Sequence, residues 1–218
     1  MPASYPAMYR DRSGEERTTI ENDGRVLRMM LRGVEFAGCF WDDWTPAYGT
    51  TADRVATFTL WDGTLSGYVL DCELPLPVVR AGTESTGTLH VHFEMDVPES
   101  DCPIAECRLL LQLDWSGATY SSSGNSTDFE SALNEVQAVL PAHAYLRICN
   151  SCALSDYYPG GQPLFAALAC FRGNKAAYRK VKNRWDLFRV WDTRTEQVQE
   201  IHLCPEFERR APGTGHRG

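Results

Sequence analysis

The 218-residue sequence lacks any long apolar run. Its apolar stretches, such as Leu109-Leu-Leu111, are far shorter than the roughly 20 residues that a membrane-spanning helix needs. The first residues, Met1-Pro-Ala-Ser-Tyr-Pro6, show no basic region followed by an apolar segment, so we expect no secretory signal. The sequence therefore predicts a cytoplasmic protein that has no membrane partner.

The sequence also lacks an excess of positive charge. Its net charge is −8 at pH 7. Nonspecific affinity for nucleic acid comes from clustered Lys and Arg side chains that release counterions from phosphates. We therefore expect no nucleic-acid partner, and another protein is the expected binding partner.

Familiar catalytic motifs are missing as well. The sequence has no Gly-x-Ser-x-Gly elbow, no His-Glu-x-x-His pair, no Walker loop and no Gly-x-Gly-x-x-Gly turn. Asp156 with Glu206 or Glu208 is too little to define an acid–base pair. A hydrolase is therefore disfavoured, and whether the protein is an enzyme stays open.

The first half of the chain has the pattern of β-strands. Hydrophobic residues make up 43% of the sequence and charged residues 23%, as in an ordinary globular protein. Apolar and polar residues alternate between residues 17 and 126, and Asp62-Gly63 suits a tight hairpin turn. Successive hairpins without a crossover helix predict an antiparallel β-sandwich or a strongly curled sheet.

The second half has helical patterns. Phe129, Leu133, Val136 and Leu140 fall on one face of a predicted helix that Ser126 or Thr127 would cap. Two more helices are predicted over residues 175–182 and 184–202. The sequence therefore predicts an α+β fold, in which an N-terminal antiparallel β-sandwich or curled sheet is followed by a helical, cysteine-rich C-terminal part. The expected segments are a loosely held arm (1–16), an antiparallel β region (17–126), a helical cysteine-rich region packed on it (127–210) and a flexible tail (211–218).

Four cysteines in the second half have a spacing typical of a metal site. Cys149 and Cys152 form a C-x2-C pair, and Cys170 and Cys204 follow after 17 and 33 further residues. Two cysteines separated by two residues can bind one ion from a single turn. Four thiolates leave no open position for water, so this pattern predicts a structural zinc site.

Alternatives to zinc remain for the same cysteines. Zinc fingers usually supply their ligands as two close pairs, and here the second pair is split between distant residues. The sulfurs could hold an iron–sulfur cluster, Cys149 and Cys152 could cycle between dithiol and disulfide, or the thiols could be buried as small hydrophobic groups.

Other polar residues are weaker candidates. His90 and His92 alternate with apolar residues on a predicted strand, which suits a metal pair or, more simply, a solvent-exposed face. Asp42 and Asp43 could bind a cation or serve as loop caps. The basic residues of the predicted helix 175–182 could attract an acidic partner or form a solvated face.

Several motifs together resemble a known family. They are Cys149-x2-Cys152-x2-Ser155-Asp-Tyr157, Cys170-Phe-Arg172 and Leu203-Cys-Pro-Glu-Phe-Glu-Arg-Arg210 with Pro212-Gly-Thr-Gly215, and earlier Tyr9-Arg-Asp-Arg12 and Arg32-Gly-Val-Glu-Phe36. The chain is similar to members of the bacterial domain-of-unknown-function family 6304 almost from end to end. The resemblance implies no activity, because the family has no established one.

Two classes of function follow. The first is a non-catalytic protein stapled by zinc through Cys149, Cys152, Cys170 and Cys204, which acts as an accessory or interaction protein. The second is an iron–sulfur or dithiol redox protein or enzyme that uses the same four cysteines.

Overall fold

The computed structural model describes residues 3–98, 106–126, 128–160 and 167–217 and is rich in strands. Strands account for 43% of the described residues and helices for 17%. Within these ranges, each helix is too short or too polar to cross a membrane. The expected α+β class is therefore wrong in its C-terminal half, where no extended helical region forms among the described residues.

The chain divides into two compact units, and each is made of two separate segments. The sheet unit comprises Met1–Pro75 and Thr88–Val139, and the C-terminal unit comprises Leu76–Gly87 and Leu140–Gly218. The predicted segments, with boundaries at residues 16, 126 and 210, stay a prediction.

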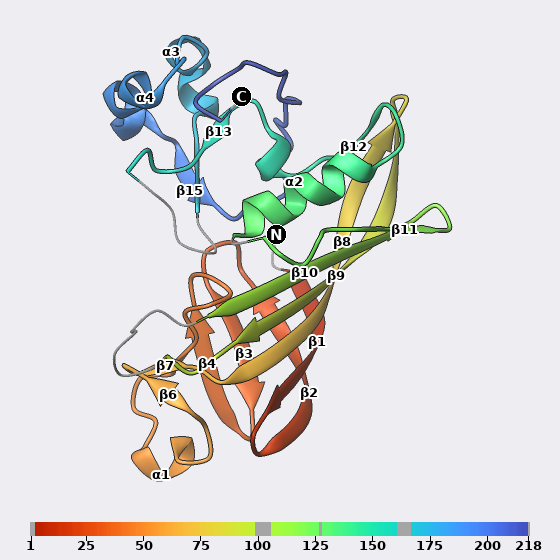
Figure 1. Ribbon diagram of the computed structural model, residues 1–218. Helices are drawn as coiled ribbons and strands as arrows, with labels where there is room; N and C mark the ends of the chain where they lie inside the picture. Colours follow the sequence, from red (N-terminus) through yellow and green to blue (C-terminus); the bar gives the residue numbers. More distant parts are fainter. Residues whose placement is uncertain (1–2, 99–105, 127, 161–166, 218) are drawn as a thin grey trace. The chain divides into compact units, whose positions relative to one another are not determined.

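One large antiparallel sheet contains most of the strands (Figure 1). Its strand order is β11-β10-β9-β8-β1-β2-β3-β4-β5, and β12 pairs with β8. The strands are β1 (Ala3–Asp11), β2 (Gly14–Asn22), β3 (Leu27–Leu31), β4 (Val34–Gly38), β5 (Thr45–Pro46), β8 (Tyr68–Arg80), β9 (Thr83–Met95), β10 (Cys107–Trp115), β11 (Ala118–Ser121) and β12 (Ala144–Leu146).

Alternation of buried and solvent-facing residues explains this sheet. In β9 the side chains of Leu89, Val91 and Phe93 are buried, while His90 and His92 between them point to the other face. Successive residues of a strand point to opposite faces, so a period of two covers one face and leaves the other open. The sheet thus has an inner face in the core and an outer face that carries polar residues.

The predicted tight turn at Asp62-Gly63 is present. It joins β6 (Leu60–Trp61) to β7 (Thr64–Leu65), which form a separate two-stranded sheet next to the short helix α1 (Ala52–Val55). Both turn residues have positive φ, 48° for Asp62 and 81° for Gly63. Such values match a turn that follows the twist of a hairpin.

A buried ion pair stabilises the core of the sheet unit. The guanidinium of Arg32 donates two hydrogen bonds, 2.9 and 2.6 Å long, to the carboxylate of Asp11, whose side chain is 1% exposed. Tyr9 donates a further bond of 3.0 Å to the same carboxylate. The guanidinium carbon lies 4.8 Å from the ring centre of Phe58. Asp11 and Arg32 come from two of the motifs noted in the sequence, and the fold brings them together.

The predicted helix after residue 126 is confirmed as α2 (Phe129–Val139). Phe129, Leu133 and Val136 are buried on one face, and the helix packs on β10 and β11. The carboxylate of Asp128 accepts a bond of 2.7 Å from the backbone N–H of Ser131. Thr127, one of the two expected caps, lies outside the described residues.

The C-terminal unit has its own small sheet and short helices. The sheet order is β13-β14-β15, with antiparallel neighbours. The elements are β13 (Ser155–Asp156), β14 (Leu168–Cys170), β15 (Glu196–Val198), α3 (Lys175–Tyr178), α4 (Arg184–Val190) and three short 3-10 helices, Cys149–Ser151, Arg172–Asn174 and Trp191–Thr193.

The helix expected over residues 184–202 is much shorter. Its start is as expected, because the side chain of Asn183 accepts bonds from the backbone N–H groups of Trp185 and Asp186. The helix α4 ends at Val190, and the chain then passes through a 3-10 turn into β15. Val198 lies within the predicted helix, but it pairs with Leu168 in a strand. A single apolar residue does not distinguish the two periodicities.

Candidate functional site

The four predicted cysteine ligands are all buried in the C-terminal unit, but they do not form a metal centre. Cys149, Cys170 and Cys204 pack in one apolar cluster with Tyr157. Cys152 packs in a second cluster. In the part of the chain that the structure describes, no group of three or more His, Cys, Asp or Glu side chains could hold a metal ion.

Burial determines the chemistry of these thiols. The pKa of the Cys149 thiol is raised above its ordinary value, first by burial and then by the nearby Cys152, Cys204 and Cys170. Burial also raises the pKa of Cys170. Metal ligation and nucleophilic attack both need the thiolate. At neutral pH these two groups are neutral thiols that pack as small hydrophobic side chains.

The predicted function of a metal-stapled protein is therefore wrong. None of the seven cysteines in the described ranges forms a disulfide, so the dithiol alternative finds no cysteine pair either. The C-x2-C spacing marks a local turn instead, since Cys149 lies in a 3-10 helix and the N–H of Cys152 donates to its carbonyl at 3.1 Å. Whether zinc or an iron–sulfur cluster is a cofactor stays an untested prediction.

The histidines of β9 lie on the open outer face, as the simpler of the two sequence interpretations expected. The Nδ1 atom of His92 is 2.6 Å from the carboxylate of Asp71, and its Nε2 atom is 3.1 Å from Glu94. His90 lies 3.1 Å from Asp114 and 3.7 Å from Glu73. Both rings are therefore held between carboxylates of the same face.

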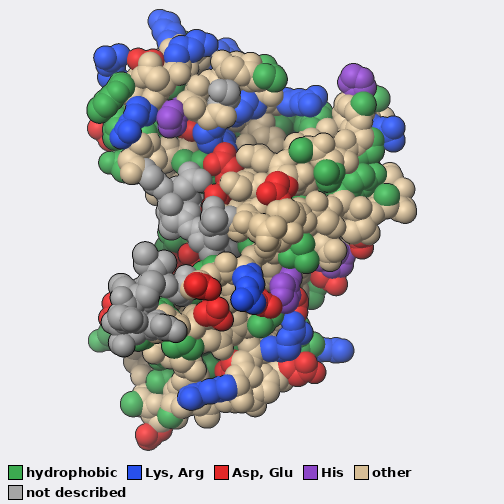
Figure 2. Space-filling model, viewed as in Figure 1, with side chains coloured by type: hydrophobic (Ala, Val, Ile, Leu, Met, Phe, Trp, Pro, Cys, Tyr) green, Lys and Arg blue, Asp and Glu red, His purple; other side chains and the backbone are tan. Residues whose placement is uncertain are grey.

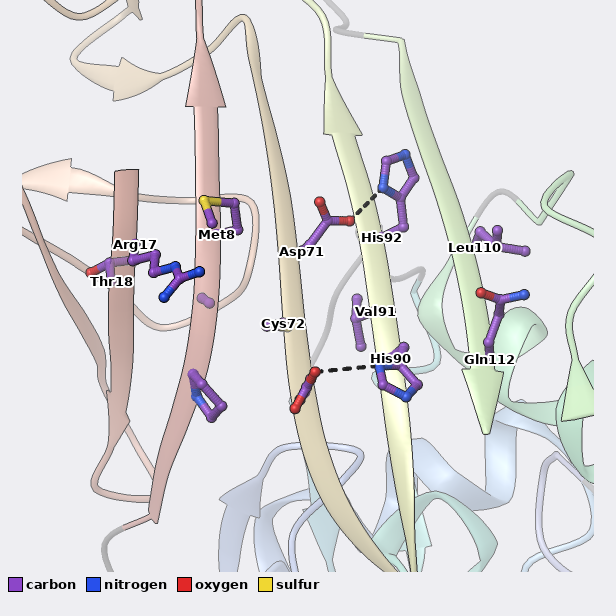
Figure 3. A pocket seen from close by; sticks show the side chains of 13 residues that line it. Met8, Arg17, Thr18, Asp71, Cys72, His90, Val91, His92, Leu110 and Gln112 are labelled. Carbon is purple, nitrogen blue, oxygen red and sulfur yellow. Dashed lines mark hydrogen bonds and ion pairs between the residues drawn. The ribbon is translucent and has the colours of Figure 1, made fainter. Parts of the chain in front are cut away.

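A groove of about 690 Å³ runs over this face (Figure 3). It crosses five adjacent strands, β2, β1, β8, β9 and β10. Its lining is Pro6, Ala7, Met8, Arg17, Thr18, Asp71, Cys72, Glu73, His90, Val91, His92, Leu110 and Gln112. All of these residues belong to the sheet unit.

Strand register sets the order of side chains in the groove. Met8 is opposite Arg17 on one side and opposite Asp71 on the other. His92 is opposite Leu110, and His90 is opposite Gln112. Figure 3 shows apolar Met8 and Leu110 on either side of the Asp71–His92 pair. The groove thus combines apolar contact area with a few placed polar groups, as binding sites commonly do.

Charges of both signs lie in and beside the groove. Asp71, Glu73, Glu94 and Asp114 supply carboxylates, whereas Arg17 and His92 supply cations. Arg10 forms an ion pair with Asp71, and Arg108 forms one of 3.2 Å with Glu94. Glu73 is paired with His90 and not with an arginine, and its side chain is 57% exposed. A positively charged group of a ligand suits the position of Glu73.

The two carboxylates beside His92 favour its protonated form. Partial burial alone would lower its pKa, but the hydrogen bonds to Asp71 and Glu94 outweigh burial and raise the pKa. Both ring nitrogens then act as donors, and neither has a lone pair with which to accept a proton. His92 is therefore suited to positioning its two carboxylates and unsuited to general-base work.

The adjacent acids Asp42 and Asp43 have separate structural surroundings. The carboxylate of Asp43 accepts bonds from the backbone N–H groups of Cys39 and Phe40, at 3.0 and 2.8 Å, which is the capping role considered for it. Burial raises the pKa of Asp42 to about 6. The two carboxylates are not part of the groove.

The basic segment of the C-terminal unit is partly neutralised. Lys175 lies 3.1 Å from Glu208, and Arg179 lies 2.6 Å from the same carboxylate. The unit carries 13 Lys and Arg against 8 Asp and Glu, a net charge of +5, whereas the sheet unit carries 8 against 21, a net charge of −13. Basic side chains gather over α3 and α4 in Figure 2.

Sequence reasoning identified the histidines but not their partners. Asp71, Glu73 and Asp114 come from other strands, and only the pairing of β8, β9 and β10 brings them to the histidines. The available signal was a polar residue at alternate positions, Asp71 and Glu73 in β8 and Gln112 and Asp114 in β10, which indicates an outward face but not the residues opposite.

The fold and the groove define a β-rich protein with an open sheet face. The chain belongs to a family of unknown function, DUF6304, which matches residues 3–155. The match contains the whole groove and ends at Ser155, so the resembling motifs at residues 170–172 and 203–215 lie beyond it. No curated protein and no solved structure matches the chain.

Proposed function

We propose that this protein binds another protein, and that the groove on the outer sheet face receives a segment of that partner. The groove itself is the observation that carries the proposal: five strands contribute to one concavity with apolar and charged walls. The family match supports it, because every residue of the groove lies within residues 3–155.

The chemistry of the groove supports a basic segment with apolar side chains. Met8, Pro6 and Leu110 offer apolar area, and burying such area is the main favourable term in association. The net charge of −13 on the sheet unit, together with the exposed Glu73, favours Lys or Arg on the partner and disfavours acidic segments. The bound segment would place an apolar side chain against Met8 or Leu110 and a cation near Glu73.

Selection of peptides tests this function. A displayed library of random short peptides is selected on the full chain, and the selected peptides are measured by fluorescence anisotropy. We expect enrichment of Lys, Arg and apolar residues. Leu110→Arg places a cation in the groove and should weaken binding by at least about tenfold, because it adds like charge and removes apolar contact.

Met30→Arg is the matched control. Met30 is an exposed apolar residue on β3, 51% accessible, and it is not among the groove residues. This variant should bind the selected peptides as the wild type does. Peptides that show no basic enrichment, or that bind equally to both variants, would contradict the proposal.

We also propose that the protein acts in the cytoplasm. Neighbouring thiols such as Cys149, Cys152 and Cys170 persist without pairing where glutathione keeps the compartment reducing. Cell fractionation of the tagged chain against a cytoplasmic marker tests the location. Recovery with the membrane or outside the cell would contradict it.

A further inference from the structure

The C-terminal tail inserts an arginine into the C-terminal unit. Arg217 follows a stretch of turns and bends over residues 211–216, yet its side chain is only 10% exposed. Its guanidinium lies 4.9 Å from the ring centre of Tyr157. The tail was expected to be flexible, and these contacts give its last described residue a defined place.

The pocket meets the guanidinium with complementary groups on several sides. The Nη1 atom of Arg217 donates to the side-chain carbonyl of Asn150 at 3.0 Å, and Nη2 donates to the backbone carbonyl of the same residue at 3.1 Å. Nη2 also donates to the hydroxyl of Ser155 at 3.1 Å and to its carbonyl at 3.4 Å. The Nε atom lies 3.5 Å from Asp156. A planar fork with several donors fits such a set, and a lysine ammonium does not.

Arg217 balances part of the negative charge that Asp156 brings into the pocket. Asp156 is fully buried, and the hydroxyl of Tyr178 donates to its Oδ2 atom at 2.9 Å. Two of its contacts come from the tail, the N–H of His216 at 3.1 Å and the guanidinium of Arg217. A buried carboxylate that loses its cation is strongly destabilised. If the tail left, the pocket would favour another guanidinium in its place.

The pocket and its occupant belong to different parts of the chain. Asn150, Ser155, Asp156 and Tyr157 lie in one short stretch, and the family match includes the first two and ends directly before the third. Arg217 lies 62 positions beyond that end, in a segment without helix or strand. In the structure, a pocket at the C-terminal border of the family match therefore holds an arginine that comes from the turn-rich tail.

We propose that residues 150–157 form an arginine-binding pocket, which the tail residues 211–217 fill as an intramolecular ligand. An arginine-bearing segment of another protein competes with the tail for this pocket. The proposal concerns the C-terminal unit and does not depend on the groove of the sheet unit.

Chemical rescue of an emptied pocket tests the proposal. Arg217→Ala in the full chain should lower the midpoint of thermal unfolding by roughly 5 °C, because the buried carboxylate loses its cation. Ethylguanidinium at millimolar concentration should restore part of this loss, whereas ethylammonium should not. Arg209→Ala is the control, because Arg209 stacks on Tyr145 at the surface, and ethylguanidinium should not raise its midpoint.

Peptide binding tests recognition in trans. A fluorescent peptide with the sequence of residues 213–218 should bind the Arg217→Ala chain at least about tenfold more tightly than the same peptide with Lys at the position of Arg217, and at least about tenfold more tightly than it binds the wild type. If Arg217→Ala does not fold, Arg217→Lys keeps the charge and length and serves as the receptor. Equal binding of the Arg and Lys peptides to the receptor used would overturn the proposal, as would binding to the wild type with equal affinity.

Discussion

The carboxyl group of Asp42 illustrates how burial acts on one residue. Its pKa is raised to about 6 in the folded protein, and an unfolded aspartate titrates near about 4. The folded state therefore binds the proton more tightly, and the stability linked to Asp42 is present at low pH and lost as the pH rises through about 6. Above that pH a charged group is buried at a cost.

Asp42→Asn removes this cost without changing the shape of the side chain. We expect the free energy of unfolding to rise by about 2 kcal/mol near pH 8 and to change far less near pH 4. Urea unfolding at the two pH values measures the difference. An equal effect at both would show that the charge of Asp42 is not responsible.

The ion pair of Asp11 and Arg32 stabilises the charged form of a carboxyl group, which is the opposite of the effect of burial on Asp42. Its two hydrogen bonds and the bond from Tyr9 satisfy a carboxylate that is removed from water. Asp11→Asn leaves the guanidinium without its counter-charge and should cost about 3 kcal/mol of unfolding free energy. Asp114→Asn, at an exposed pair with His90, should cost far less in the same assay, because solvent screens that pair. Similar losses would mean that burial adds nothing to the Asp11 pair.

At the residue scale, the sequence was sufficient to predict which side chains face outward. His90 and His92 alternate with three apolar residues, and that period determines their face. Asp71 could not be assigned to His92, because its position depends on how β8 pairs with β9, which local periodicity does not encode.

At the element scale, the capping of α4 offers a direct test. Asn183 accepts bonds from two backbone N–H groups at the helix start, 2.9 and 3.1 Å long. Asn183→Ala removes both acceptors and should cost about 1 kcal/mol, whereas Asn183→Asp supplies an equivalent acceptor and should cost little. Thermal unfolding of the two variants distinguishes capping from general surface packing, which would be affected by both.

Elements with a strong local pattern were predictable, and those determined by distant contacts were not. The face of β9, the turn at Asp62-Gly63 and the helix α2 follow from period and turn chemistry. The three residues of β15 are a strand only because they pair with β14. The same applies to β1, which was expected as a loose arm and pairs with β2 on one side and β8 on the other.

At the scale of the whole molecule, burial separates the cysteines into reactive and protected groups. Cys39 is exposed, whereas Cys149, Cys152, Cys170 and Cys204 are buried. We expect iodoacetamide to label Cys39 in the native protein and the other four only after unfolding, because a buried thiol is not accessible to the reagent. Peptide mass mapping measures the labelling. Rapid native labelling of Cys149 or Cys170 would contradict the burial described above.

The four cysteines also show the limit of motif spacing. Their sequence positions predicted convergence on one ion, and the fold does place them in neighbouring apolar clusters. Spacing describes where thiols lie along the chain, but the direction of each side chain depends on the packing around it. The metal-binding interpretation was wrong, because among the described residues no group of three or more such side chains could hold an ion.

The interleaved segments of the two units have a practical consequence for gene fragments. A clone that stops where the family match stops, at Ser155, would retain Leu76–Gly87 and the strand β12 that pairs with it, but would discard residues 156–218 of the C-terminal unit. It would also expose Leu154, which is 1% accessible in the intact chain. The truncated protein should aggregate during expression, whereas the 218-residue chain should not.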